Sequence, residues 1–230
     1  MPRRKRYLIA KMPYHVVQRG HNRSNCFYDE TDKACYLSIL ETYLKTYQVQ
    51  LHAFVLMSNH VHLLLTASKD DVISRVIQNL GRDYVHYFNK RYQRVGTLWD
   101  GRFKDSLVET DQYFLTCQRY IELNPVRAKM VAHPADYHWS SYHANARGIK
   151  ISVVTPHQVY LNLAETAERR LENYRALFQD SLPADDLKSI RDAIKHSYPL
   201  ANESFVQHLT TKYNMNFGRR NKGRPEKGSE

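Results

Sequence analysis

The stretch Leu51-His-Ala-Phe-Val-Leu-Met-Ser-Asn-His-Val-His-Leu-Leu-Leu65 decides how the chain folds. Two apolar runs flank the short polar turn Ser58-Asn59, which predicts a β-hairpin with strands over 49–57 and 60–66. Side chains alternate across a strand, so His60 and His62 project from one face. Two convergent imidazoles can begin a metal site, although histidines are also tolerated on half-exposed sheets.

The residues before the hairpin predict a strand followed by a helix. Residues 14–19 are rich in β-branched side chains and predict the strand. Thr31 or Asp32 can cap a helix that runs to about residue 47, because leucines then recur at three-to-four spacing. The hairpin is therefore preceded by a β-α unit.

The residues after the hairpin repeat this alternation. Asp70 or Asp71 begins an amphipathic helix that reaches about residue 92. A strand over 104–109 and a helix over 111–124 follow, and Pro125 should end that helix because the residue before proline is pushed out of helical geometry. The order β-α-β-β-α-β-α predicts an α+β fold of the ferredoxin-like split βαβ type, an antiparallel sheet with helices on it.

Composition divides the chain into four parts. A basic arm that we expect to be flexible precedes the main domain, and a small helical appendage and a basic tail that we expect to be disordered follow it. The four parts cover residues 1–12, 13–150, 151–216 and 217–230, and the helical segments of the third are 156–179, 183–196 and 202–213.

The charge balance points to a polyanionic partner. The 230 residues include 34 Lys and Arg against 23 Asp and Glu, which gives a net charge of +11. The apolar runs are too short to span a bilayer, so we expect no membrane partner. The N-terminus lacks the apolar stretch of a signal peptide, so we expect a cytoplasmic protein. Three dispersed cysteines argue against a Cys-rich zinc site.

Tyr120 and Asn124 are candidates for the chemistry of the last predicted helix. They lie four residues apart and so share a helix face. The phenol could attack phosphorus, and the amide offers a carbonyl oxygen. An aromatic core residue and a helix-ending Asn explain the same pattern, and spacing alone does not select Tyr120 from 17 tyrosines.

Three stretches, in order, resemble the single-tyrosine HUH transposases, and the resemblance is closest to the REP-associated tyrosine transposases of bacteria. The first is Tyr14-His-Val-Val-Gln-Arg-Gly-His-Asn-Arg23, and the second is the hairpin quoted above. The third is Gly101-Arg-Phe-Lys104, followed by Arg119-Tyr-Ile-Glu-Leu-Asn-Pro-Val-Arg127. The resemblance covers roughly residues 12–143 and marks the segment 13–150 as an HUH catalytic domain.

The resemblance implies a reaction and a residue for each role. His60 and His62 match the histidine pair that binds Mg²⁺ or Mn²⁺, and Tyr120 matches the nucleophile. Asn124 matches a polar third metal ligand, at a position where some relatives carry Gln. The implied function is a transposase-type endonuclease and strand transferase that cleaves single-stranded or hairpin DNA through a 5′-phosphotyrosine. Whether the protein is a monomer or a homodimer stays open.

Basic and polar residues near the first turn and the fourth strand are candidates for DNA contact, and the basic arm is a candidate electrostatic hook for phosphates. Solvated surface charge is the other interpretation of the same residues. The candidates are Arg3, Arg4, Lys5, Arg6, Arg19, Asn22, Arg23, Arg102 and Lys104.

Three other functions fit the same sequence. The predicted sheet also folds into nucleic-acid-binding modules that stack bases on exposed aromatics and cut nothing. A metal-dependent hydrolase could use His60 and His62 to activate water. A domesticated transposase could bind its repeat and rarely cut.

Overall fold

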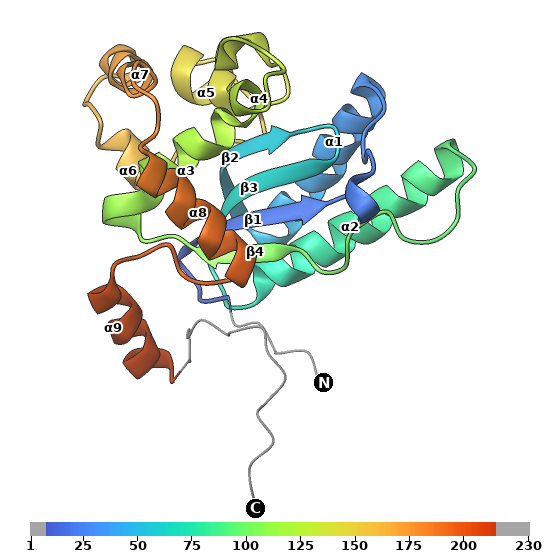
Figure 1. The fold of residues 1–230 in the computed structure, drawn as a ribbon, viewed down its shortest axis with the longest axis horizontal. Coiled ribbons are helices and arrows are strands. Elements are labelled where there is room, and N and C mark those ends of the chain that lie inside the picture. Colours follow the sequence, from blue (N-terminus) through green and yellow to red (C-terminus); the bar gives the residue numbers. More distant parts are fainter. Residues whose placement is uncertain (1–7, 215–230) are drawn as a thin grey trace, which may run out of the picture.

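A four-stranded antiparallel sheet forms the centre of the molecule (Figure 1). The computed structural model describes residues 8–214, apart from the side chains of residues 110–112. The strand order is β2-β3-β1-β4, with α1 connecting β1 to β2 and α2 connecting β3 to β4. This is the split βαβ arrangement, so the predicted fold class is confirmed. The elements are β1 (Pro13–Arg19), α1 (Glu30–Tyr47), β2 (Val49–Leu56), β3 (His60–Ala67), α2 (Val72–Arg91) and β4 (Lys104–Leu107).

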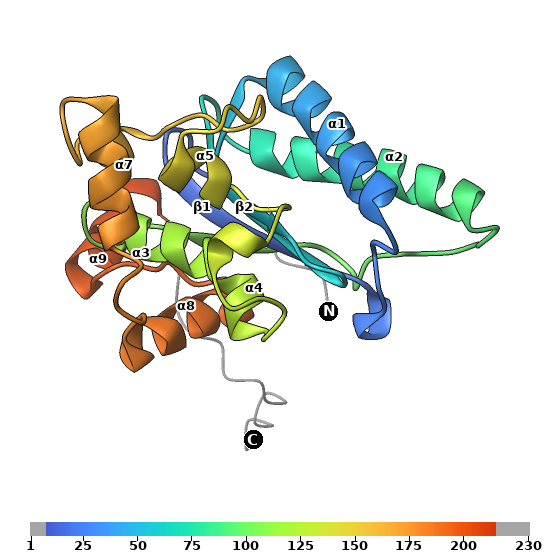
Figure 2. The same ribbon diagram turned by 90° about the horizontal axis from the view of Figure 1, so that it is seen from above.

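Different helices cover the two faces of the sheet. Helices α1 and α2 lie on one side, and α3 (Thr110–Glu122) and α8 (Ala184–His196) lie on the other (Figure 2). Alternation along β3 sends Val61 and Leu63 into the core under α1 and α2. Leu64 packs in a second core with Tyr120 of α3. His60 and His62 therefore face α3. They share one face of the sheet, opposite Val61, as the alternation predicted.

The start of α1 differs from the prediction. Asp29 is the N-cap, and its side chain accepts a hydrogen bond from the Asp32 backbone N–H at 3.0 Å. Asp32 is instead fully buried, where it accepts hydrogen bonds from Tyr87 and Arg91 of α2. The cap at Thr31 or Asp32 was thus wrong, because the carboxylate of Asp32 joins the two helices. Asp71 stands at the N-cap position of α2, as predicted, although its side chain makes no capping hydrogen bond.

Pro125 does not lead the chain out of helical structure. Helix α3 ends at Glu122, and the short helix α4 (Asn124–Arg127) begins directly after Leu123. Pro125 occupies the first turn of α4, where a missing backbone N–H needs no partner. The predicted helix over 111–124 therefore ends two residues early, and Asn124 opens the next helix.

The helices after residue 150 pack onto the sheet domain. Ile190 and Ala193 of α8 share a core with Tyr120, and Leu209 of α9 (Glu203–Tyr213) joins the core under α1 and α2. The segment predicted over 156–179 is two helices, α6 (Gln158–Leu161) and α7 (Ala167–Ala176). The remaining elements are the 3-10 turns η1 (His21–Arg23) and η2 (Pro134–Asp136) and the helix α5 (Tyr142–Arg147). The division of the chain at residue 150 stays a prediction. Most of the basic arm and the tail lie outside the described residues.

Among the helices of residues 8–214, none combines the length and the apolarity that crossing a lipid bilayer demands.

A buried carboxylate anchors the end of α3. Glu122 is inaccessible to solvent, and its oxygens accept hydrogen bonds from Ser141 at 2.6 Å, Asn145 at 2.8 Å and Tyr174 at 2.8 Å. These partners lie before α5, in α5 and in α7, so Glu122 ties the helix of Tyr120 to the C-terminal helices. Burial raises the pKa of Glu122 to about 7, although the three hydrogen bonds oppose the rise.

Glu122→Gln should flatten the pH dependence of folding stability. Because the folded-state pKa is raised from 4.5 to about 7, the folded state binds this proton more tightly than the unfolded state. The wild-type free energy of unfolding should therefore fall as pH rises from about 4.5 to about 7, by about 3 kcal/mol from this group. Urea denaturation of both proteins from pH 5 to 8 measures the difference, and parallel pH profiles would contradict it.

Candidate active site

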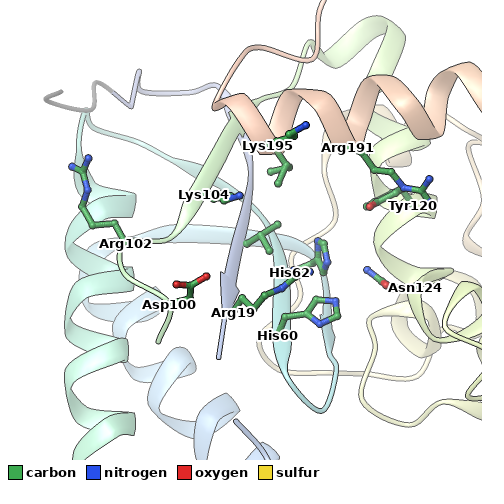
Figure 3. Close-up of a pocket in the computed structure, with 12 residues that line it drawn as sticks. Arg19, His60, His62, Asp100, Arg102, Lys104, Tyr120, Asn124, Arg191 and Lys195 are labelled. Atoms are coloured by element: carbon green, nitrogen blue, oxygen red, sulfur yellow. The ribbon is translucent and has the colours of Figure 1, made fainter. Parts of the chain in front are cut away.

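A cavity of about 390 Å³ opens between the sheet, α3 and α8 (Figure 3). It brings together the two histidines of β3, Tyr120 of α3 and Asn124 of α4, which the sequence had singled out. Cationic side chains from β1, β4 and α8 surround them. The lining residues are Val17, Arg19, His60, His62, Asp100, Arg102, Lys104, Tyr120, Asn124, Arg191, Ile194 and Lys195.

The two histidines of β3 are close and uncharged at neutral pH. Their ring centroids lie 5.1 Å apart. Burial lowers the pKa of His60 to about 4, with repulsion from Arg19 and Arg127 adding to the shift. Burial likewise holds the pKa of His62 well below its usual range. Neutral imidazoles keep a lone pair, which a metal ligand requires.

Hydrogen bonds already occupy the Nδ1 atom of both rings. His60 Nδ1 lies 2.6 Å from Asn59 Oδ1, and His62 Nδ1 lies 2.7 Å from Nε2 of His15. Within residues 8–214, the Nε2 atom of neither ring has a hydrogen-bond partner. Partners of this kind fix the orientation and tautomer of metal-binding histidines. The two Nε2 atoms are therefore the candidate metal donors.

His15 is a site residue that the sequence did not reveal. On β1 it lies two residues from Val17, which pairs directly with His62, so both face the cavity side of the sheet. The His15 ring is buried, and burial lowers its pKa to about 3. The cross-strand register between β1 and β3 was the missing information, because Tyr14-His15 carries no spacing signal of its own.

Because both rings are neutral, one proton lies between Nε2 of His15 and Nδ1 of His62. If His62 carries it on Nδ1, the ring donates to Nε2 of His15 and its own Nε2 keeps a lone pair for a cation. If His15 carries it, the proton of His62 must sit on Nε2 and blocks that donor. His15 is thus placed to set which nitrogen of His62 can bind a metal.

Arg127 lies against the proposed nucleophile. Its guanidinium carbon is 3.9 Å from the centroid of the Tyr120 ring, and it donates a 2.8 Å hydrogen bond to the Tyr120 carbonyl oxygen. Burial lowers the pKa of Arg127, Tyr120 opposes that shift, and repulsion from Arg191 adds to it. A positive charge held here can attract a negatively charged group that lies beside the phenol.

The predicted DNA contacts fall into three groups. Arg19, Arg102 and Lys104 line the cavity. Asn22 and Arg23 lie on the exposed turn η1, outside the lining. Arg3, Arg4, Lys5 and Arg6 lie outside the described residues. Sequence reasoning missed Arg191 and Lys195, which α8 brings to the cavity from 67 and 71 residues beyond Asn124.

The donor set restricts which metal could bind. Residues 8–214 contain no group of three or more His, Cys, Asp or Glu side chains that could hold an ion. Two imidazoles and the Asn124 amide would leave the other positions to water and substrate oxygens. Mixed nitrogen and oxygen ligation with open positions suits Mn²⁺ or Mg²⁺.

The sequence profile described as "Transposase IS200 like" matches residues 9–124, half of the chain. The chain belongs to this family. This IS200-like transposase matches no curated protein. Among solved structures it resembles a REP-associated tyrosine transposase bound to a REP hairpin, with 19% identity and a TM-score of 0.56 over 68% of this chain and 93% of the other. A putative transposase of Deinococcus radiodurans matches with 23% identity and a TM-score of 0.38 over 53% of this chain and 96% of the other.

The family match ends at Asn124, so it spans all of the candidate residues that the sequence assigned to metal binding and nucleophilic attack. The cavity extends further. The α8 side chains of the lining lie beyond the matched segment, so this IS200-like transposase builds part of its cavity from residues that the family profile does not include.

Proposed function

We propose that this IS200-like transposase is a divalent-metal-dependent endonuclease and strand transferase for single-stranded DNA, with Tyr120 as its nucleophile. The observation that carries the proposal is the convergence of Tyr120, His60 and His62 in one cation-rich cavity. The helix of Tyr120 begins more than 40 residues after the histidine strand ends, so only the fold brings these groups together.

His60 and His62 would hold Mg²⁺ or Mn²⁺ through Nε2, and Asn124 would add its amide oxygen. When bound, such an ion withdraws charge from a phosphate oxygen and positions the phosphorus for in-line attack. The lowered pKa values of the histidines and their occupied Nδ1 atoms support this assignment.

Tyr120 would perform a reversible transfer. Its phenol oxygen forms a bond to phosphorus, the bond from phosphorus to the 3′ oxygen breaks, the phenol loses its proton and the departing oxygen gains one. The 5′-phosphotyrosine keeps the energy of the original phosphodiester. A different 3′-hydroxyl can then reverse the step, which joins two strands without ATP.

Single-stranded DNA beside a hairpin is the substrate that we propose. The reacting phosphate must reach a cavity of about 390 Å³, and an unpaired strand can bend into it more easily than a duplex. The cationic lining suits a phosphate backbone. The REP-associated transposase with a similar fold is bound to a REP hairpin, and we extend that class of partner to this chain.

The polarity of the covalent link tests the proposal. Hairpin oligonucleotides with unpaired flanks, labelled at either the 5′ or the 3′ end, are incubated with the protein and Mn²⁺ and then denatured in detergent. We expect the 3′ label to stay on the protein and the 5′ label to leave on a free fragment, with no reaction in EDTA. Cleavage without a covalent link would instead support a water-activating hydrolase.

His15→Phe should weaken Mn²⁺ binding by about 10–100-fold, because loss of an orienting partner of a metal ligand has effects of that size. His15→Gln should retain most of the affinity, since its amide oxygen can accept the proton of His62 Nδ1. Calorimetric Mn²⁺ titration of both variants, without DNA, measures this. Equal affinity in His15→Phe and the wild type would remove His15 from the support of the site.

A further inference from the structure

Helix α8 is fixed against the catalytic face although it lies beyond the family match. Ile190 and Ala193 are buried in the core that contains Tyr120. The segment after the helix joins β4, because the backbone N–H of Leu200 donates to Leu107 at 2.7 Å. Figure 1 shows α8 lying across the sheet near β4. Helix α8 is therefore held in place as one side of the cavity.

Three side chains of α8 face the cavity. Arg191, Ile194 and Lys195 have the spacing of one helix face, and all three line the cavity with Tyr120 and His60 (Figure 3). Burial lowers the pKa of Arg127, the residue over the Tyr120 ring, and repulsion from Arg191 adds to that shift.

No carboxylate of residues 8–214 pairs with the two cavity-lining cations of α8. Within residues 8–214, neither Arg191 nor Lys195 has a carboxylate within ion-pair distance. Asp100 is the one acidic residue of the lining, against five arginines and lysines. Like charges gathered at a cavity raise the free energy of the folded protein, and an anionic ligand relieves that repulsion.

We propose that Arg191 and Lys195 form a phosphate-binding pair that contacts the DNA strand next to Tyr120. Helix α8 would thereby complete the active site. The inference rests on the proposed function. The planar fork of Arg191 can bind two oxygens of one phosphate, and the ammonium of Lys195 can bind a neighbouring one. Both contacts are made to the phosphate backbone of the DNA, so they should contribute equally to the affinity for every base sequence.

Binding in EDTA tests the pair without cleavage. A labelled hairpin oligonucleotide with single-stranded flanks is titrated at several salt concentrations with wild type, Arg191→Gln, Lys195→Gln and the double variant. Each single change should weaken binding about tenfold, the size expected for a charge-assisted contact. The double variant should lower the slope of log affinity against log salt by about 1.4, and a scrambled oligonucleotide should lose affinity equally.

Two controls distinguish the loss of a DNA contact from a folding defect and from a general change in net charge. Lys188→Gln removes an exposed cation of the same helix that does not line the cavity, and it should change affinity by less than about twofold. Arg191→Lys keeps the charge but loses the fork, so its affinity should lie between those of Arg191→Gln and the wild type. No variant should unfold below the wild-type temperature.

The outcomes separate the pair from the proposed function. Wild-type affinity in the double variant, or an equal loss in Lys188→Gln, would overturn the pair even if the wild type forms a covalent link with Mn²⁺. Weakened binding in the double variant would support the pair even if no link forms, and only the proposed function would then fail. A wild type that binds neither oligonucleotide would overturn both.

Discussion

Tyr120→Phe is expected to abolish cleavage and covalent attachment while leaving hairpin affinity within about twofold, because only the attacking oxygen is lost. The ring keeps its place, since Tyr120 is 8% exposed and packs edge-on to His62 with centroids 6.0 Å apart. The Arg127 guanidinium still lies over a phenyl ring. Loss of a nucleophile lowers the rate by a factor on the order of 10⁴ to 10⁶ in other enzymes.

Single-turnover cleavage of a labelled hairpin measures this effect, and Tyr113→Phe is the matched control on the same helix, because Tyr113 does not line the cavity. Residual cleavage at the wild-type rate in Tyr120→Phe would show that water or another tyrosine attacks the phosphate.

His60→Ala and His62→Ala should each lower Mn²⁺ affinity by ~100-fold or more and stop metal-dependent cleavage, whereas Asn124→Ala should have a smaller effect. Imidazole nitrogen binds transition metals more strongly than a neutral amide oxygen, so each histidine contributes more to affinity. Calorimetric Mn²⁺ titration in the absence of DNA separates metal binding from catalysis.

The matched control is His86→Ala, which removes an exposed histidine of α2 away from the cavity. Unchanged Mn²⁺ affinity in both β3 variants would remove His60 and His62 from the metal site. An equal loss in His86→Ala would show that the titration reports surface binding.

Local patterns were enough to predict the sheet and the histidine pair of the cavity. The two apolar runs around Ser58-Asn59 predicted the hairpin, and alternation placed His60 and His62 on the face opposite Val61. The order of the elements then predicted the split βαβ arrangement of an antiparallel sheet. Selecting Tyr120 from the other tyrosines needed the family resemblance, since its spacing to Asn124 also fits a core residue.

The site residues that the sequence did not reveal reach the site through contacts between segments that are far apart in the chain. His15 reaches His62 through the register of β1 against β3, which no local pattern records. Arg191 and Lys195 reach the cavity because buried residues of α8 pack against α3, a contact between segments far apart in the chain. Asp29 replaced the predicted cap because Asp32 was drawn into the contact between α1 and α2.

Identification of the residue that becomes covalently linked to DNA tests the central claim most directly. Wild-type protein that has reacted with a hairpin oligonucleotide in Mn²⁺ is digested with nuclease and trypsin, and the nucleotide-bearing peptide is sequenced by mass spectrometry. Trypsin releases residues 120–127, a peptide in which Tyr120 is the one tyrosine. We expect a 5′-phosphate link on that residue. A link on any other residue, or through a 3′-phosphate, would contradict the account.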